Sequence, residues 1–174
     1  MLIWNEFVNR EHARSIIARA LAFAGTLVFS LAIVSALPKF KEQRQRYFTQ
    51  ATMDGSLGRM RLLHFAGANI NSRSNGSMPL FIAAGEGRSD VVRYLLAEGA
   101  DVNARERLGD TALTEATYYG HVALVKELLA HGADINAVGN DGTALDIAIN
   151  RNNVAVADLL RHHGARRACE IGGC

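Results

Sequence analysis

The stretch "HVALVKELLAH", residues 121–131, alternates apolar and polar positions with the period of a helix. The charged Lys126 and Glu127 fall on one side of that helix. The opposite side forms an apolar stripe at i, i+3, i+6 and i+7: Val122, Val125, Leu128 and Leu129. The pattern predicts an amphipathic helix that ends at Gly132, because glycine readily adopts the left-handed conformation that terminates helices.

A shorter helix is predicted just before this one, in "TALTEATYY", residues 111–119. Thr111 occupies the position of an N-cap, and Gly120 the position of a C-terminal stop. Beyond the second helix, Asp134 and Asn136 favour turns and extended backbone. The unit therefore predicts two helices joined by a turn and followed by a projecting loop.

This unit occurs four times along the chain. The Gly-Ala pair that closes it recurs at intervals of 32, 33 and 32 residues, at Gly67, Gly99, Gly132 and Gly164. Three further markers keep the same register: Gly55, Gly87, Gly120 and Asn152; Ala51, Ala83, Ala116 and Ala148; Phe48, Leu80, Leu113 and Leu145. We therefore predict four copies, at about 44–75, 76–108, 109–137 and 138–168, because such repeats bury their apolar faces only by stacking on one another.

The end copies differ from the middle ones. The second member of a paired leucine in copies two and three is His64 in the first copy and Arg161 in the last. A polar residue suits a face that no neighbour covers, so these copies are expected to cap the array. The array is expected to be complete.

The residues "GDTALTEA" and "DGTALDIA", together with "GHVALVKELLAHGADINA", resemble the ankyrin repeat. The resemblance covers residues 44–168 and implies an all-α solenoid with protruding loops and a concave protein-binding surface, without catalysis. Only Pro79 keeps the family's proline, which is Ala112 and Ala144 elsewhere. The family histidine, which ties neighbouring loops together, is replaced by Phe81, Thr114 and Asp146.

The family's variable surface positions, carried over to this sequence, predict where a protein partner of unspecified identity binds. They are Ser74, Asn75, Ser77, Glu86, Arg107, Leu108, Asp110, Tyr118, Tyr119, Asn140, Asn150 and Arg151. Exposed tyrosine and arginine dominate binding hot spots, which makes Tyr118, Tyr119 and Arg107 the centre of this prediction. The alternative for Tyr119 is packing against the next copy.

An uncharged segment, "ALAFAGTLVFSLAIVSAL", precedes the repeats at residues 20–37. A helix of these 18 residues would be about 27 Å long, close to the roughly 30 Å hydrocarbon core of a bilayer. A buried globular helix usually keeps a polar face, and this segment has none. We therefore predict a hydrophobic membrane helix flanked by Arg19 and Lys39, which can reach the headgroups.

Two interpretations of this segment remain. A permanent single-pass anchor is favoured, because the charged leader at residues 1–19 and the apolar run are both long for a signal peptide. The alternative is a signal cleaved after Ala36, within Val34-Ser35-Ala36, which would release a periplasmic or secreted protein. Three basic residues before the segment and four after it leave the topology open. Residues 38–46 are expected to form a charged linker or to start the next helix.

Composition and charge narrow the function further. The chain has 19 basic and 17 acidic residues, a balance that does not suggest nucleic acid as a partner. Its six histidines lack metal-ligand spacing, and no cofactor, nucleophile-elbow or phosphate-loop motif occurs. Neither a metal site nor an enzyme is therefore expected. Cys169 and Cys174 fall in an expected flexible tail, residues 169–174; the alternative is a disulfide within it or to another chain.

Overall fold

A computed structural model describes residues 38–73 and 76–172 of the 174-residue chain. The regular structure of these residues is helical, apart from an isolated β-bridge between Gly139 and Gly142. The helices are α2 Pro38–Met53, α3 Leu57–Phe65, α4 Pro79–Gly85, α5 Ser89–Ala97, α6 Ala112–Tyr118, α7 Val122–Ala130, α8 Ala144–Asn150, α9 Val154–His162 and α10 Ala168–Gly172. None of the helices in these described residues is long and apolar enough to span a bilayer, and the predicted membrane segment, residues 20–37, lies outside them.

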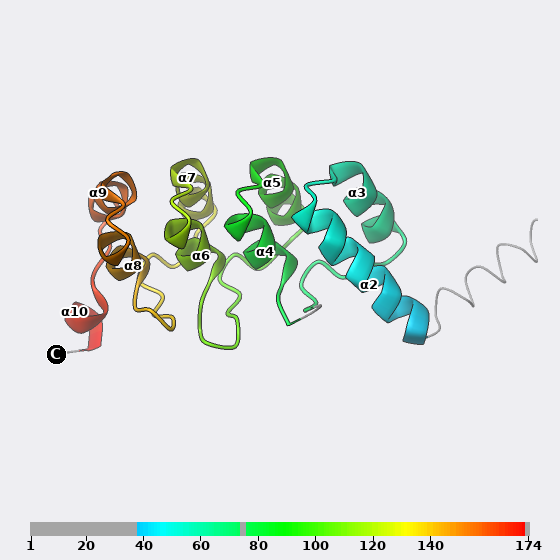
Figure 1. Ribbon diagram of the computed structural model, residues 1–174, viewed down its shortest axis with the longest axis horizontal. Coiled ribbons are helices and arrows are strands. Elements are labelled where there is room, and N and C mark those ends of the chain that lie inside the picture. The colour runs from blue at the N-terminus through cyan, green and yellow to red at the C-terminus, as the bar shows by residue number, and fades with distance from the viewer. Residues whose placement is uncertain (1–37, 74–75, 173–174) are drawn as a thin grey trace, which may run out of the picture. The chain divides into compact units, whose positions relative to one another are not determined.

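Successive helices pair into hairpins: α4 packs against α5, α6 against α7, and α8 against α9. The inner helices α4, α6 and α8 form one row, the outer helices α3, α5, α7 and α9 form a second row, and long loops project beyond the inner row (Figure 1). This arrangement confirms the all-α repeat solenoid with protruding loops.

Small residues hold the inner row together. The marker alanines of all four copies are at most 2% exposed, which lets neighbouring inner helices approach closely: Ala51, Ala83, Ala116 and Ala148. In outer helix α7, Leu124, Val125 and Leu128 are buried, whereas Val122 and Leu129 are half-buried. The expected stripe was therefore wrong in omitting Leu124, because α7 packs against both its own inner helix and the flanking outer helices.

The local signals at the ends of the inner helices are confirmed. The Thr111 hydroxyl accepts a hydrogen bond from Thr114 N, and Thr143 does the same with Asp146 N. The side chains of Thr114 and Asp146 bond back to the N-cap amides, completing two capping boxes. Asn152 has φ 55°, so it takes the left-handed conformation that glycine adopts in the other copies.

Asparagine side chains join each loop to the next. Asn71 accepts a hydrogen bond from Asp101 N at 3.0 Å and donates to Gly99 O at 3.1 Å. Asn103 makes the same pair of bonds in the following copy, to Asp134 N and Gly132 O. These bonds satisfy backbone groups that would otherwise have no partner, and so they fix the spacing of the loops.

The first copy has no preceding asparagine, and Gln45 of α2 takes over that role. Its side chain accepts a hydrogen bond from Asn69 N at 2.9 Å and donates to Asn69 O at 2.8 Å and Ser72 O at 3.3 Å. Asn69 is the residue equivalent to Asp101. The first loop is thus closed by a residue of its own copy, a contact that the sequence pattern did not predict.

The structure decides between two expectations for one segment and differs from the expectation for another. Residues 38–46, expected to form a charged linker or to start the next helix, belong to α2, which begins at Pro38. Residues 169–172, expected to be part of a flexible tail, belong to helix α10. Asp146 anchors this helix by accepting hydrogen bonds from Arg167 Nε and Ala168 N, both at 2.8 Å. Asp146 stands where the family has its loop-tying histidine. Its hydrogen bonds therefore connect the last repeat to the C-terminal helix α10.

Candidate functional site

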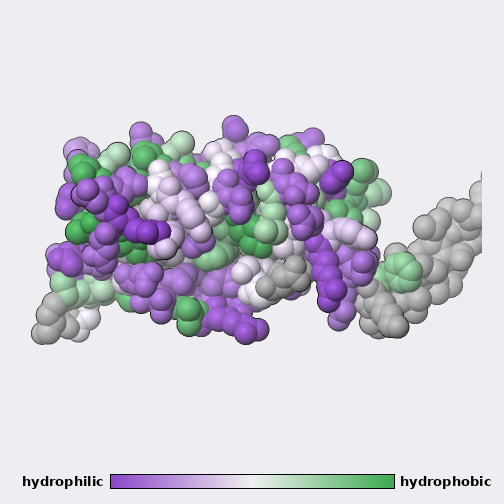
Figure 2. Space-filling view, in the orientation of Figure 1, coloured by the Kyte–Doolittle hydropathy of each residue, from purple (hydrophilic) through white to green (hydrophobic). Residues whose placement is uncertain are grey.

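The predicted partner-binding residues are distributed along the surface formed by α4, α6, α8 and the loops before them, here called the inner face. Eight of them are exposed: Glu86, Arg107, Leu108, Tyr118, Tyr119, Asn140, Asn150 and Arg151. Ser77 and Asp110 are half-buried, and Ser74 and Asn75 lie outside the described residues. In the view of Figure 2 the hydrophobic residues form small patches separated by hydrophilic ones.

The structure gathers the tyrosines with Arg151. The Tyr118 and Tyr119 rings are 5.1 Å apart in an edge-to-face arrangement. The guanidinium carbon of Arg151 lies 3.4 Å from the centroid of the Tyr118 ring, a cation–π contact between copies three and four. Tyr119 stacks on His121 of its own copy and still keeps 56% of its surface exposed. Both ring contacts of Tyr119 are with its own copy, and the alternative, packing against the next copy, stays a prediction.

Asn140 links two carboxylates beside these rings. Its backbone N donates to Asp110 Oδ1 at 3.0 Å, and its side-chain Nδ2 donates to Asp141 Oδ1 at 3.1 Å. Asp110 precedes α6 and Asp141 precedes α8, so the two acidic side chains come from neighbouring copies. Their positions are fixed relative to each other by one asparagine.

Several of these residues line a cavity of about 280 Å³ between α6 and α8, here called the inner pocket. Its lining residues include the acids Asp110, Glu115 and Asp141 and the tyrosines Tyr118 and Tyr119. The aliphatic side chain of Ile147, on α8, supplies an apolar wall. No lysine, arginine or histidine is among the described residues that line it.

Glu115 is the residue of the inner pocket whose environment is most unusual. Its side chain is half-buried, and its carboxylate makes no hydrogen bond or ion pair with a described residue. Burial raises the pKa of Glu115, and the nearby charges of Asp110 and Glu106 raise it further. A carboxyl group in a cleft whose pKa is raised by burial and neighbouring charges is a candidate for a functional site.

Sequence reasoning named neither Glu115 nor Asp141 as a candidate site residue. One signal could have found Glu115: it lies three and four residues before Tyr118 and Tyr119, which puts all three on one side of a helix. Nothing in the linear sequence could have brought Asp141 to them, because that approach depends on how closely copies three and four stack.

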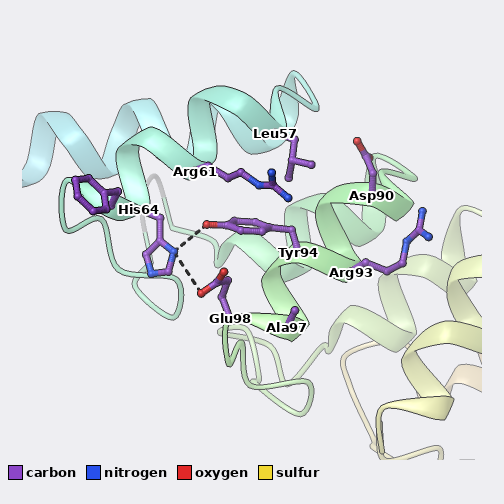
Figure 3. Close-up of a pocket in the computed structure, with 9 residues that line it drawn as sticks. Leu57, Arg61, His64, Asp90, Arg93, Tyr94, Ala97 and Glu98 are labelled. Atoms are coloured by element: carbon purple, nitrogen blue, oxygen red, sulfur yellow. Dashed lines mark hydrogen bonds and ion pairs between the residues drawn. The ribbon is translucent and has the colours of Figure 1, made fainter.

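A second cavity, of about 840 Å³, lies between outer helices α3 and α5 (Figure 3). His64 Nδ1 is 2.9 Å from the Tyr94 hydroxyl and 3.9 Å from Glu98 Oε2. The expectation that His64 marks an uncovered face was therefore wrong: it replaces a seam leucine with a polar contact to the second copy. Burial and Glu98 raise the pKa of Tyr94, while Arg61, whose guanidinium carbon lies 5.7 Å from the ring centroid, lowers it.

Arg161, the corresponding residue of the last copy, is exposed and pairs with Asp158 of its own helix. The cavity between α3 and α5, here called the outer cavity, is lined by residues of both charges: the basic Arg61 and Arg93 and the acidic Asp90 and Glu98. This lining does not select the charge of a ligand, in contrast to the inner pocket.

Comparison with known proteins places these features in a family. The family model described as "Ankyrin repeats (3 copies)" matches residues 31–106, 48–139 and 105–169. A putative ankyrin repeat-containing protein of Treponema pallidum (strain Nichols) is 30% identical over 168 residues, which is 93% of this chain and 53% of that protein. The ankyrin repeat and KH domain-containing protein mask-1 of Caenorhabditis elegans is 36% identical over 131 residues, 73% of this chain and 5% of that protein.

A shorter match involves the E3 ubiquitin-protein ligase XBAT33 of Arabidopsis thaliana, which is 51% identical over 43 residues, 25% of this chain and 8% of that protein. The chain thus spans about half or less of the length of these relatives. The similarity identifies a shared repeat, and it carries no activity from the larger proteins to this one.

Proposed function

This chain belongs to the ankyrin repeat family, and from that premise we propose that it is a membrane-tethered module that binds a partner protein. The family's repeats are typically non-catalytic interaction domains, and nothing in the described residues indicates catalysis. The partner docks on the inner face, which stacked repeats present as an extended surface. Residues 20–37 hold the module at the membrane.

The observation that carries this proposal is the cluster of Tyr118, Tyr119 and Arg151. Tyrosine and arginine dominate interface hot spots because they contribute large contact areas together with polar ends. These side chains extend from the ends of short helices that are otherwise mostly buried, and each contacts another member of the cluster. A partner would therefore meet side chains that are already ordered, which reduces the entropy lost on binding.

The docking surface is tested by photo-crosslinking in cells that express the full chain. A photoreactive amino acid at Leu108, exposed on an inner-face loop, should capture one partner band, whereas the same group at the exposed Lys126 of outer helix α7 should not. The changes Tyr118→Ala and Arg107→Ala together should abolish the band from Leu108. Equal capture from both positions, or an unchanged band in the double variant, would refute the inner face as the binding surface.

The alternative function is an exported module, cleaved after Ala36, that scaffolds or protects a partner enzyme. The small residues Val34-Ser35-Ala36 favour it. Intact-mass measurement of the cellular protein separates the two functions. We expect an N-terminus near Met1 and retention with membranes after alkaline extraction, whereas an N-terminus at Leu37 in the soluble fraction would establish export.

A further inference from the structure

The four copies provide an internal reference for the residue at the centre of the inner pocket. Counting back 17 residues from the closing glycine reaches Gln50 in copy one, Ile82 in copy two, Glu115 in copy three and Ile147 in copy four. Gln50 is exposed, but Ile82 is half-buried and Ile147 is buried, so in the two copies adjacent to Glu115 this position lies toward the core side of the inner helix. A carboxylate here breaks the pattern of its neighbours and loses hydration, and such departures are most common at functional sites.

Neighbouring negative charges add to the unfavourable free energy of the partly dehydrated Glu115 carboxylate when no partner is bound. Asp110 and Asp141 line the same pocket, and no basic residue is among its described lining residues. Arg151 contacts the ring of the lining residue Tyr118 without being part of the lining itself. Like charges in a partly dehydrated cavity disfavour one another, whereas a cation entering the cavity would be attracted by all of them. Charge complementarity therefore indicates a positively charged ligand.

The aromatic rings indicate the chemical form of that cation. Tyr118 already carries the guanidinium of Arg151 on its face, at 3.4 Å, which demonstrates that this ring accepts a planar cation in this environment. The neighbouring Tyr119 is 56% exposed and borders the same pocket without such a contact among the described residues. An extended side chain could place its aliphatic part against Tyr119 and its charge beside the carboxylates.

Other positively charged ligands fit less well. The carboxylates do not converge on one point: among the described residues no group of three or more histidine, cysteine, aspartate or glutamate side chains could hold a metal ion. The volume of about 280 Å³ is slightly below the roughly 300–1,000 Å³ of pockets that bind whole small molecules. One long side chain is a better match for this size.

Building on the proposed function, we infer that the inner pocket receives a lysine or arginine side chain of the partner protein. Its charge lies between Glu115 and Asp110, with Asp141 at the mouth, and its stem lies along Tyr119. The partner is thus a protein that presents a basic residue at the centre of its binding segment. The Arg151–Tyr118 pair borders the inner pocket. The positive charge of Arg151 would contact an acidic residue of the partner next to the basic one.

The inference is tested by nuclear magnetic resonance on the full chain labelled at its tyrosine rings. The chain has four tyrosines, so Tyr118 and Tyr119 report on the pocket while Tyr47 and Tyr94 serve as internal controls. The probes are N-acetyl-arginine methylamide and its lysine analogue, compared with the citrulline analogue, which has nearly the shape of arginine without its charge. The two cationic probes should shift Tyr118 and Tyr119 alone, and the citrulline probe should not.

Two variants at Glu115 make the test independent of folding. Glu115→Gln keeps the shape and should weaken binding of the arginine probe about tenfold, as expected for loss of a charge-assisted contact. Glu115→Ile restores the residue of copies two and four; it should abolish binding while leaving the unfolding midpoint equal to or above that of the wild type. Glu98→Gln, in the outer cavity, is the matched control and should leave binding unchanged.

Each contrary outcome is informative. Three results would overturn the inference that the inner pocket receives a basic side chain. They are equal binding of the citrulline probe, unchanged affinity in Glu115→Gln, and the same ring shifts with Ca²⁺ alone. If the partner still crosslinks to the inner face in Glu115→Ile cells, the proposed function stands and this inference fails. If the arginine probe binds while nothing crosslinks to the inner face, the pocket stands and the proposed function fails.

Discussion

Asp146 connects the last repeat to the C-terminal helix, and its removal should loosen both. The carboxylate accepts hydrogen bonds from Arg167 Nε, Ala168 N, Thr143 N and the Thr143 hydroxyl, at 2.8–3.1 Å. The Asp146 residue is 8% exposed, so these partners replace most of its water. Burial alone raises the pKa of Asp146, but the bonds from Arg167, Ala168 and Thr143 outweigh it and lower the pKa to about 2.

The pKa gives the size of the expected effect. The ordinary value of 3.8 less the folded value of about 2 leaves a difference of about 1.8 in pKa. Each pKa unit corresponds to about 1.36 kcal/mol, so the charged form of Asp146 contributes about 2.5 kcal/mol before screening. The side chain of Arg167 is 48% exposed, which allows solvent to weaken its part of the interaction. We expect Asp146→Asn to lower the free energy of unfolding by about 2 kcal/mol at neutral pH.

The dependence on pH has a definite sign. The pKa is lower in the folded state than in the unfolded chain, so the stabilisation is fully present above about pH 4. It is lost as the pH falls through about 2, because protonation removes the charge that Arg167 contacts. The free energy of unfolding of the wild type should therefore fall between pH 4 and pH 2 more steeply than that of the Asp146→Asn variant.

Urea unfolding of the full chain, followed by circular dichroism across this pH range, measures both quantities. Amide hydrogen exchange should show faster exchange in α10 and at Thr143 in Asp146→Asn. Arg167→Gln is the matched control and should destabilise less, because three of the four hydrogen bonds remain. A variant that unfolds within about 0.5 kcal/mol of the wild type at neutral pH, with the same acid dependence, would refute the assignment of Asp146 as the anchor.

Two further predictions concern the spacing of the copies. Gln45→Ala leaves Asn69 N without its side-chain partner and should lower the free energy of unfolding by about 1 kcal/mol, measured in urea, with loss of exchange protection confined to the first loop; protection equal to the wild type would contradict the closing role of Gln45. Gly87→Ala should destabilise by about 1 kcal/mol or more, because Gly87 has φ 68° and a Cβ there would lie 2.8 Å from His121 Cε1. Gly58→Ala is its control: no atom lies within 4 Å of the added methyl in this helical position, so the same urea measurement should show an unchanged or raised stability.

The repeat period made the fold predictable from the sequence. Thr111 and Thr143 at the N-caps, and Asn152 in a glycine position, are local signals that depend on a few adjacent residues, and the structure confirms them. Gln45 and the contacts of Asp146 with Arg167 escaped prediction because their partners are 24 and 21 residues away. Gln45 and Asp146 each accept a hydrogen bond from a backbone amide at one end of the array, where no further copy provides a partner. A repeat pattern describes the middle copies, so the special contacts of the ends fall outside it.

The sequence predicted the surface that carries the candidate site, but it did not predict the acidic residue Glu115 in the inner pocket. The positions of Tyr118, Tyr119 and Arg151 follow from the family pattern, because that pattern specifies which residues face outward. The pattern leaves the position of Glu115 unspecified, and Glu115 is half-buried, so a search for exposed side chains passes over it. Comparison with the two adjacent copies finds it, as a carboxylate between Ile82 and Ile147, although the first copy also has a polar residue there, Gln50. In a repeat protein the neighbouring copies show which side chains the fold accepts at a position, so a carboxylate that replaces the isoleucine of both adjacent copies is a reason to test Glu115 for binding together with the exposed tyrosines.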